Sequence, residues 1–235
     1  MPPRSTALTP PHAPPALLRL SEIGALCERI YPERGWPALK LRCRLGWRMW
    51  RHPQVYGTVR TLYADSPWRE VGQAHPRSYR KVFNDYPFSG LSLAQRADWL
   101  QTHCRLTTSL FGDEVLPAIL HRCDAPLCRV ALPGGHGLLH IRLIHAHQFE
   151  REGDLSLVLE DPFGTPLFLL SFSFEQDAQG LGLVIGGLQG RLGLDTARQL
   201  TKFCLGVRPP NLLLFALQRG TPGPNAYGRD PLAEA

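Results

Sequence analysis

The hydrophobic pattern of the chain changes at Pro126, and this change constrains the fold more than any other feature. Before it, apolar residues recur at helical spacing, as they do between Leu17 and Ile30. After it, short apolar segments alternate with turns rich in glycine and proline, which is typical of strands. Short links between consecutive strands favour antiparallel pairing. The sequence therefore predicts an α+β fold, with a helical N-terminal half and then an antiparallel sheet with a C-terminal helix.

The spacing of apolar and turn residues gives approximate bounds for each element. Ser92-Leu-Ala-Gln95 reads as a capping box that opens a helix to about Leu110, and Gly112 ends this helix. Residues 211–217 form an apolar run that fits either a strand or a helix. Other helices are expected over 16–31, 37–52, short pieces within 53–90, a short segment around Leu116–Leu120, and Asp195–Leu205. Strands are expected over 127–132, 138–148, 154–160, 167–175 and 181–187.

The 235 residues, of which 43% are hydrophobic, suffice for one sizeable core. We expect four regions along the chain. They are a disordered Pro-rich tail at 1–15, a helical basic region at 16–122, a sheet with a helix at 123–217 in one domain with the preceding region, and a flexible tail at 218–235.

Positive charge is concentrated in the helical half. Between Glu28 and Val82 there are twelve Lys or Arg residues against four Asp or Glu residues. Within the predicted helix 37–52, four cations share one face: Lys40, Arg44, Arg48 and Arg51. This basic stripe indicates an anionic partner, which could be a lipid head group, a phosphorylated small molecule or nucleic acid, or else it is a solvated surface. We do not favour nucleic acid, because no recognition-helix motif is evident.

The same helix also carries many apolar residues. This composition predicts that it is mostly buried and shows only its basic stripe. Trp47 and Trp50 are therefore expected in the core rather than on a stacking surface.

A second candidate anion site lies near the end of the chain, where Ile185-Gly-Gly-Leu-Gln-Gly190 leads from a strand toward a helix. Glycines in such a connection can expose backbone N–H groups to a phosphate, and several cations follow. The alternative is a tight structural turn. The predicted ligand-binding residues are Gly187, Gln189, Gly190, Arg191, Lys202 and Arg208.

Other candidate chemistry is weaker. His145 and His147 would share one face of a strand, with Glu152 nearby, but isolated strand histidines are commonly ordinary polar residues, and we predict no bound metal. No residue pattern identifies a catalytic group. No apolar segment is long enough for a spanning helix or an export signal, so the expectation is a cytoplasmic protein whose contact with the inner membrane, if it has one, is peripheral.

Three ordered motifs resemble the VirK/YbjX family of bacterial proteins, with a resemblance that covers roughly residues 20–217. The motifs are Phe149–Leu157, Ile185–Gly190 and above all Leu200–Leu214, with its Thr-Lys pair, Arg-Pro and leucine run. Family members usually continue past the leucine run into a segment with basic residues, whereas this chain continues into a Pro/Gly-rich tail. The resemblance implies a role in virulence, surface-protein display and resistance to envelope stress, and it supplies no catalytic residues.

Two functional hypotheses follow. The first is a factor in cell-envelope or surface-protein homeostasis that binds an anionic ligand, lipid or envelope protein through the basic helical half. The second is a GNAT-like acyltransferase that uses a CoA thioester, because a strand, a glycine-containing loop and a helix can cradle a pyrophosphate. Leu192 and Leu194 stand where the GNAT loop pattern has small residues, so this sequence departs from it.

Overall fold

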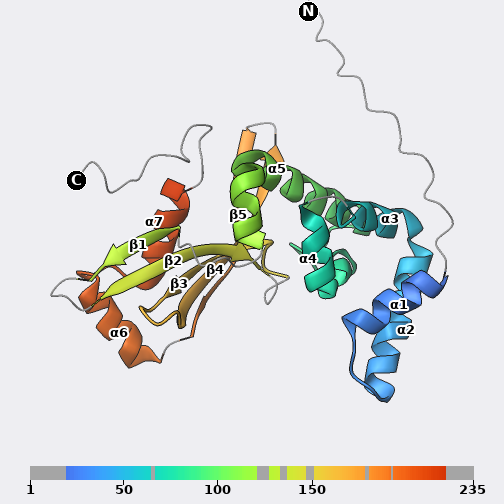
Figure 1. The fold of residues 1–235 in the computed structure, drawn as a ribbon, viewed down its shortest axis with the longest axis horizontal. Helices are drawn as coiled ribbons and strands as arrows, with labels where there is room; N and C mark the ends of the chain where they lie inside the picture. The colour runs from blue at the N-terminus through green and yellow to red at the C-terminus, as the bar shows by residue number, and fades with distance from the viewer. Residues whose placement is uncertain are drawn as a thin grey trace, which may run out of the picture.

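The computed structural model describes residues 20–64, 67–120, 127–132, 137–146, 151–177, 180–191 and 193–220. The tail expected at 1–15 lies outside these residues, as does the tail expected at 218–235 from residue 221 onward. Helices make up the first part of the chain and a sheet with two helices makes up the second, side by side along the long axis (Figure 1). The predicted α+β fold class is confirmed.

The helical part begins with α1 (Leu20–Ile30) and α2 (Trp36–Arg51), which pack against each other. Three short helices follow: α3 (Pro53–Leu62), α4 (Trp68–Ala74) and the 3-10 helix η1 (Pro76–Phe83). The long α5 (Leu93–Leu120) starts at the predicted capping box, in which Ser92 N donates to Gln95 Oε1 at 2.9 Å and Gln95 N donates to Ser92 Oγ at 3.3 Å. Gly112, at φ 65°, bends α5 where the sequence predicts a break.

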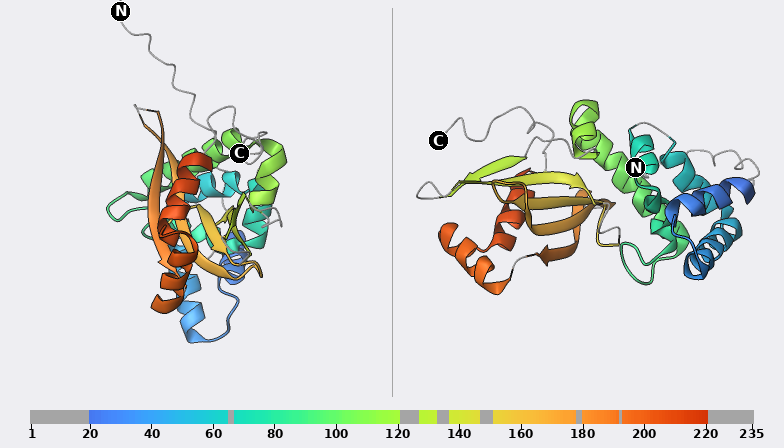
Figure 2. Two further views of the ribbon diagram at one scale, coloured as in Figure 1. Left: turned by 90° about the vertical axis from the view of Figure 1, so that its left-hand side faces the viewer. Right: turned by 60° about the horizontal axis from the view of Figure 1, so that its bottom comes forward.

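The sheet is an antiparallel meander in the order β1-β2-β3-β4-β5. Its strands are β1 (Cys128–Ala131), β2 (Leu138–His145), β3 (Leu155–Glu160), β4 (Pro166–Asp177) and β5 (Gly180–Gly190). β3 is buried along its whole length, as expected for a central strand covered on both faces. The final helices, α6 (Leu194–Phe203) and α7 (Pro209–Gly220), lie on one side of the sheet (Figure 2). The ambiguous run at 211–217 is thus helical, and the two residues before it, Pro209 and Pro210, occupy the first turn of α7.

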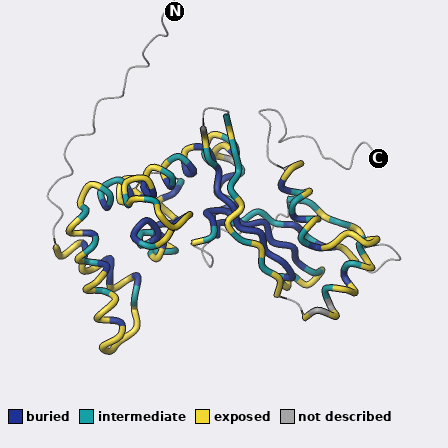
Figure 3. The backbone as a smooth tube through the Cα atoms, turned by 180° about the vertical axis from the view of Figure 1, so that it is seen from behind, coloured by how far each residue is buried: buried dark blue, intermediate teal, exposed yellow. Residues whose placement is uncertain are grey.

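One hydrophobic cluster runs from the helices into the sheet. Phe83 and Leu100 from the helices and Phe172 and Phe174 from β4 all belong to it. Figure 3 shows the buried residues concentrated in the strands and at the junction with the helices, whereas α1 and α2 are mostly exposed. No helix among the described residues is long and apolar enough to cross a bilayer.

A buried ion pair joins the two parts. Lys81 Nζ of η1 lies 2.5 Å from Asp154 Oδ1, just before β3, and also donates to the carbonyl of Gly153 at 2.7 Å. Asp154 Oδ2 accepts hydrogen bonds from the Tyr86 hydroxyl and, at 2.6 Å, from Ser173 Oγ of β4. The side chains of Lys81 and Asp154 are 3% and 2% exposed, so a substrate cannot reach them. We therefore assign this cluster to the architecture, where it fixes the helices against the sheet.

The prediction that α2 is mostly buried is wrong. Its buried face consists of Ala38, Leu45 and Met49, while Trp47 and Trp50 are 56% and 51% exposed. The reason is that α2 packs mainly against α1, α3 and η1, so its neighbours cover too little of its circumference. The helix has more apolar surface than the fold buries, and this excess defines the candidate site.

Candidate functional site

The exposed side of α2 combines tryptophans with cations. Trp36 at its start is 76% exposed, and Trp47 and Trp50 extend the aromatic surface, with ring centroids 4.9 Å apart. Leu39, also exposed, lies on the same side of the helix, because positions three or four residues apart neighbour one another. Soluble proteins rarely expose a contiguous group of large apolar side chains unless it contacts a partner or a membrane.

The predicted basic stripe flanks this aromatic surface. Lys40, Arg44 and Arg51 are exposed, and Arg48 is half-buried. Burial, the largest effect, and then the neighbouring Arg44 guanidinium lower the pKa of Arg48. The helix holds five basic residues and no acidic one, so its field favours an anion.

The fifth cation of α2, Arg42, has a structural task. Its Nε donates to the carbonyl of Tyr31 and its Nη2 to the carbonyl of Glu33, each at 2.9 Å. These bonds hold the connection between α1 and α2, and so they fix how the two helices cross. The orientation of the basic stripe relative to α1 is therefore fixed.

A groove of about 560 Å³ lies between α1 and α2. Small residues make room for it, because a Cβ added to Gly24 of α1 would meet no atom within 4 Å. Glu28 and Arg42 are its charged lining residues. Its main apolar lining consists of Leu20, Ile23, Leu39, Cys43, Trp47 and Trp50.

At the second predicted anion site, the glycines lie in a strand and not in the expected connection between a strand and a helix. Strand β5 continues to Gly190, so Gly187, Gln189 and Gly190 lie in the ladder with β4 rather than in a loop. Gln189 Nε2 donates to Glu152 Oε1 at 2.7 Å, and a Cβ on Gly187 would lie 2.0 Å from Glu152 Oε2. The protein's own carboxylate thus occupies the space beside these glycines.

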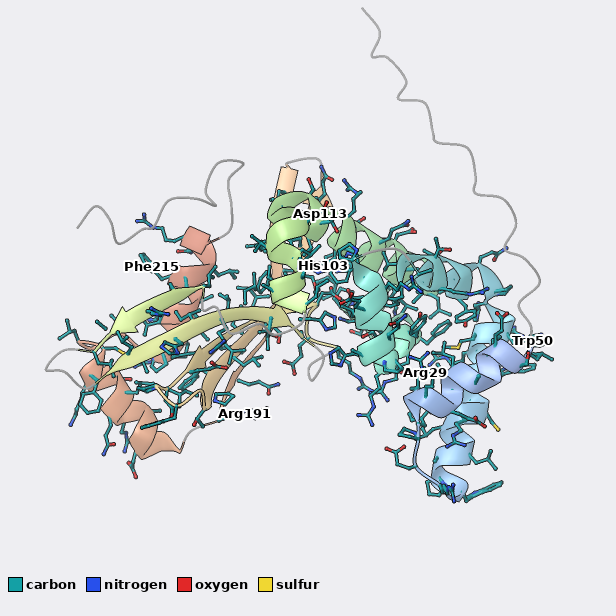
Figure 4. The ribbon with its side chains drawn as sticks, viewed as in Figure 1. Arg29, Trp50, His103, Asp113, Arg191 and Phe215 are labelled. Carbon is teal, nitrogen blue, oxygen red and sulfur yellow. The ribbon has the colours of Figure 1, made fainter. Side chains whose placement is uncertain are left out.

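The cations of that site are distributed over three segments. Arg191 follows β5, and its N–H donates to the carbonyl of Leu167 at 2.9 Å. Lys202 lies on α6 and Arg208 lies just before α7, and all three side chains are exposed. Figure 4 places Arg191 at the sheet, well away from Trp50 on α2. An anion site at these residues stays a prediction.

The glycines of β5 are explained by close packing. A Cβ at Gly186 would lie 1.8 Å from the carbonyl oxygen of Glu152, so the backbone of residues 151–154 must approach β5 at this point. We predict that Gly186→Ala lowers the free energy of unfolding by about 1–3 kcal/mol, measured by urea denaturation. Gly193→Ala is the matched control, because its Cβ would meet nothing within 4 Å and its φ of −62° suits alanine. Equal stability of the two variants would contradict this assignment.

The structure describes two of the three candidate metal ligands, His145 and Glu152. His145 ends β2, where its ring stacks on His75 at 5.8 Å between centroids and lies edge-on to Trp68. Glu152 bonds to Gln189, as described, and His147 lies outside the described residues. Among the residues that the structure does place, no group of three His, Cys, Asp or Glu could hold a metal ion.

Comparison with known proteins gives one match. The model of a family described as "Protein of unknown function (DUF535)" matches residues 34–219, from the start of α2 to the last turn of α7. Neither the curated proteins nor the solved structures contain a match.

Proposed function

Because the chain belongs to the DUF535 family of unknown function, which contains VirK and YbjX, we propose that it is a peripheral factor of the bacterial cell envelope that docks on anionic lipid through α2. The observation that carries the proposal is the exposed pairing of tryptophans with cations on one helix. The envelope role in surface-protein homeostasis and virulence is what the family resemblance implies, and docking on lipid is the physical step that we assign to this chain.

The chemistry of α2 suits a membrane interface better than bulk water. Tryptophan prefers the headgroup level of a bilayer, because its ring is apolar and its N–H is polar. Lys and Arg near an anionic surface each contribute about 1 kcal/mol of attraction. Trp36, Trp47 and Trp50 can therefore enter the interface while Lys40 and Arg44 contact lipid phosphates.

The position of α2 in the fold permits this contact. The α1–α2 pair forms one end of the molecule, away from the sheet, and Figure 4 shows Trp50 at that end. A flat membrane can approach α2 there without meeting the sheet or α7. The exposed cations of α2, which are Lys40, Arg44 and Arg51, then face the lipid phosphates, and no acidic residue of the helix interrupts them.

The acyltransferase alternative gains no support from the geometry. It requires the segment after β5 to cradle a pyrophosphate, yet the Glu152 carboxylate lies against Gly187 in that region. A carboxylate repels a pyrophosphate, so the lipid proposal is the better supported of the two.

The test is sedimentation with vesicles of phosphatidylglycerol and phosphatidylcholine. We predict that Arg44→Gln/Arg51→Gln weakens binding about 30-fold, because two cations at about 1 kcal/mol each are lost. Arg129→Gln/Arg151→Gln removes the same charge from exposed residues of the sheet half and should leave binding unchanged. Binding should also fall as salt screens the charges.

Two outcomes would contradict the proposal. One is wild-type protein that binds pure phosphatidylcholine as well as it binds anionic vesicles. The other is an equal loss in the two double variants, which would mean that net charge alone, rather than the surface of α2, governs binding. Preference for single-stranded nucleic acid over vesicles would assign the Trp and Arg residues to base stacking instead.

A further inference from the structure

The groove between α1 and α2 is built from glycines on facing helices. Gly46 of α2 faces α1, where an added Cβ would make ordinary van der Waals contact, at 3.6 Å from Ile23 Cγ2 and 3.7 Å from Cys27 Sγ. Gly24 of α1, in contrast, faces open space. Glycine costs helix stability relative to alanine by about 1 kcal/mol, and at Gly24 no packing contact requires it. A larger side chain at this position would extend into the groove, so the glycine leaves that space open.

The groove has the size and lining of a small-molecule site. Its volume of about 560 Å³ falls within the range of ligand pockets, about 300–1,000 Å³. Leu39, Trp47 and Trp50 line it from α2, and Leu20 and Ile23 line it from α1. The lining is therefore suited to an apolar ligand.

The rim of the groove is cationic on the side of α2. Trp47 lines the groove and is three residues from Arg44 and four from Arg51, so the three side chains are neighbours on the helix surface. Cys43, which also lines the groove, is three residues from Lys40, so these two side chains are neighbours as well. Glu28 is the acidic residue of the lining, and it comes from α1.

From these features we infer that the groove binds one acyl chain of an anionic membrane lipid, with the headgroup phosphate held by Arg44, Arg51 and Lys40. The inference rests on the proposed function and names its ligand. A wholly apolar ligand would leave the cationic rim unused, and a free phosphate would leave the groove unused. A lipid with one anionic phosphate and an apolar chain uses both.

The probe is lysophosphatidylglycerol below its micellar concentration, titrated calorimetrically against the full chain. Gly24→Leu should weaken binding about tenfold or more, because the leucine side chain fills open groove volume. Gly24→Ala adds only a methyl group and should bind within about threefold of wild type. Ala94→Leu, at an exposed position of α5, adds the same apolar group outside the groove and should have no effect. Lysophosphatidylcholine should bind more weakly than lysophosphatidylglycerol.

The outcomes separate this inference from the docking proposal. Undiminished lysolipid binding by Gly24→Leu overturns the groove assignment, while vesicle binding that depends on Arg44 and Arg51 would still support docking. Lysolipid binding that Gly24→Leu removes supports the groove even if vesicles are not bound, and in that case docking fails. A dimer seen in sedimentation velocity that Gly24→Leu dissociates would mean that a second copy fills the groove, and it overturns the inference.

Discussion

Replacing Lys81 with methionine is expected to lower the free energy of unfolding by about 3–5 kcal/mol, as is usual when one partner of a buried ion pair is removed. The variant would leave the Asp154 carboxylate without the ammonium that lies 2.5 Å away. Burial, the largest effect, raises the pKa of Asp154, but the Lys81 charge and the bonds from Lys81 and Ser173 outweigh it and hold that pKa far below its usual range. The carboxylate is therefore charged in the fold and depends on these partners.

Urea denaturation at neutral pH measures this loss. Arg198→Met is the matched control, since Arg198 pairs with Asp195 at 3.2 Å on the exposed surface of α6, and exposed pairs contribute little. The double variant Lys81→Met/Asp154→Asn should recover part of the stability, because it removes the unpaired charge. A Lys81→Met variant as stable as wild type would show that Tyr86 and Ser173 alone satisfy the carboxylate.

Acidification from pH 6.5 to 4 is expected to reduce the free energy of unfolding by about 3 kcal/mol through His103 alone. Burial, the largest effect, and the Lys81 charge lower the pKa of this histidine from 6.5 to about 4, although Asp154 opposes them. Between these two pH values the unfolded chain binds a proton at this position and the folded protein does not. Stability is therefore lost as pH falls through the window, and no further loss from His103 occurs below about pH 4.

The hydrogen bonds of His103 support the neutral form. Its Nδ1 accepts the backbone N–H of Phe174 at 3.0 Å, and the Thr107 hydroxyl donates to the His103 carbonyl at 2.8 Å. Because Nδ1 accepts this bond, the proton of the neutral ring is on Nε2, which can donate to Thr107 Oγ1 at 3.2 Å. A second proton on Nδ1 would break the bond to β4.

The test is to measure the free energy of unfolding of wild type and of His103→Gln at pH 7, 6, 5 and 4. Glutamine can form similar hydrogen bonds but does not titrate in this range. The difference in stability between the two proteins should change by about 3 kcal/mol across the series. Asp154, whose pKa is lowered in the fold, adds a separate loss below the unfolded value of about 3.9, and both proteins share it. Parallel curves for the two proteins would exclude His103 as the source.

The sequence predicts the order and type of the elements well, because their signals are local. The capping box at Ser92 and the break at Gly112 each depend on residues a few positions apart. The two ends of the Lys81–Asp154 pair lie 73 residues apart, and neither belongs to a motif, so no local pattern reveals the pair.

The candidate site also has one part that local sequence patterns predict and another part that they do not. The basic stripe of α2 follows from helical spacing alone, whereas the exposure of Trp47 and Trp50 depends on how few neighbours α2 has. Apolar residues on three sides of a helix fit burial as well as they fit an interface. One sequence feature could have indicated the exposed surface. The segment Trp36–Arg51 has no acidic residue, which is unusual for a helix that only packs in a core.

The long sequence separation of Lys81 and Asp154 also has a consequence during translation. The N-terminal helices leave the ribosome first, and the acid that locks η1 in place is made 73 residues later. Until then, a nascent chain can form the α1–α2 hairpin, with its groove and aromatic surface, but cannot complete the junction. The helix that we propose as the docking surface is thus synthesised before the residue that closes the junction with the sheet.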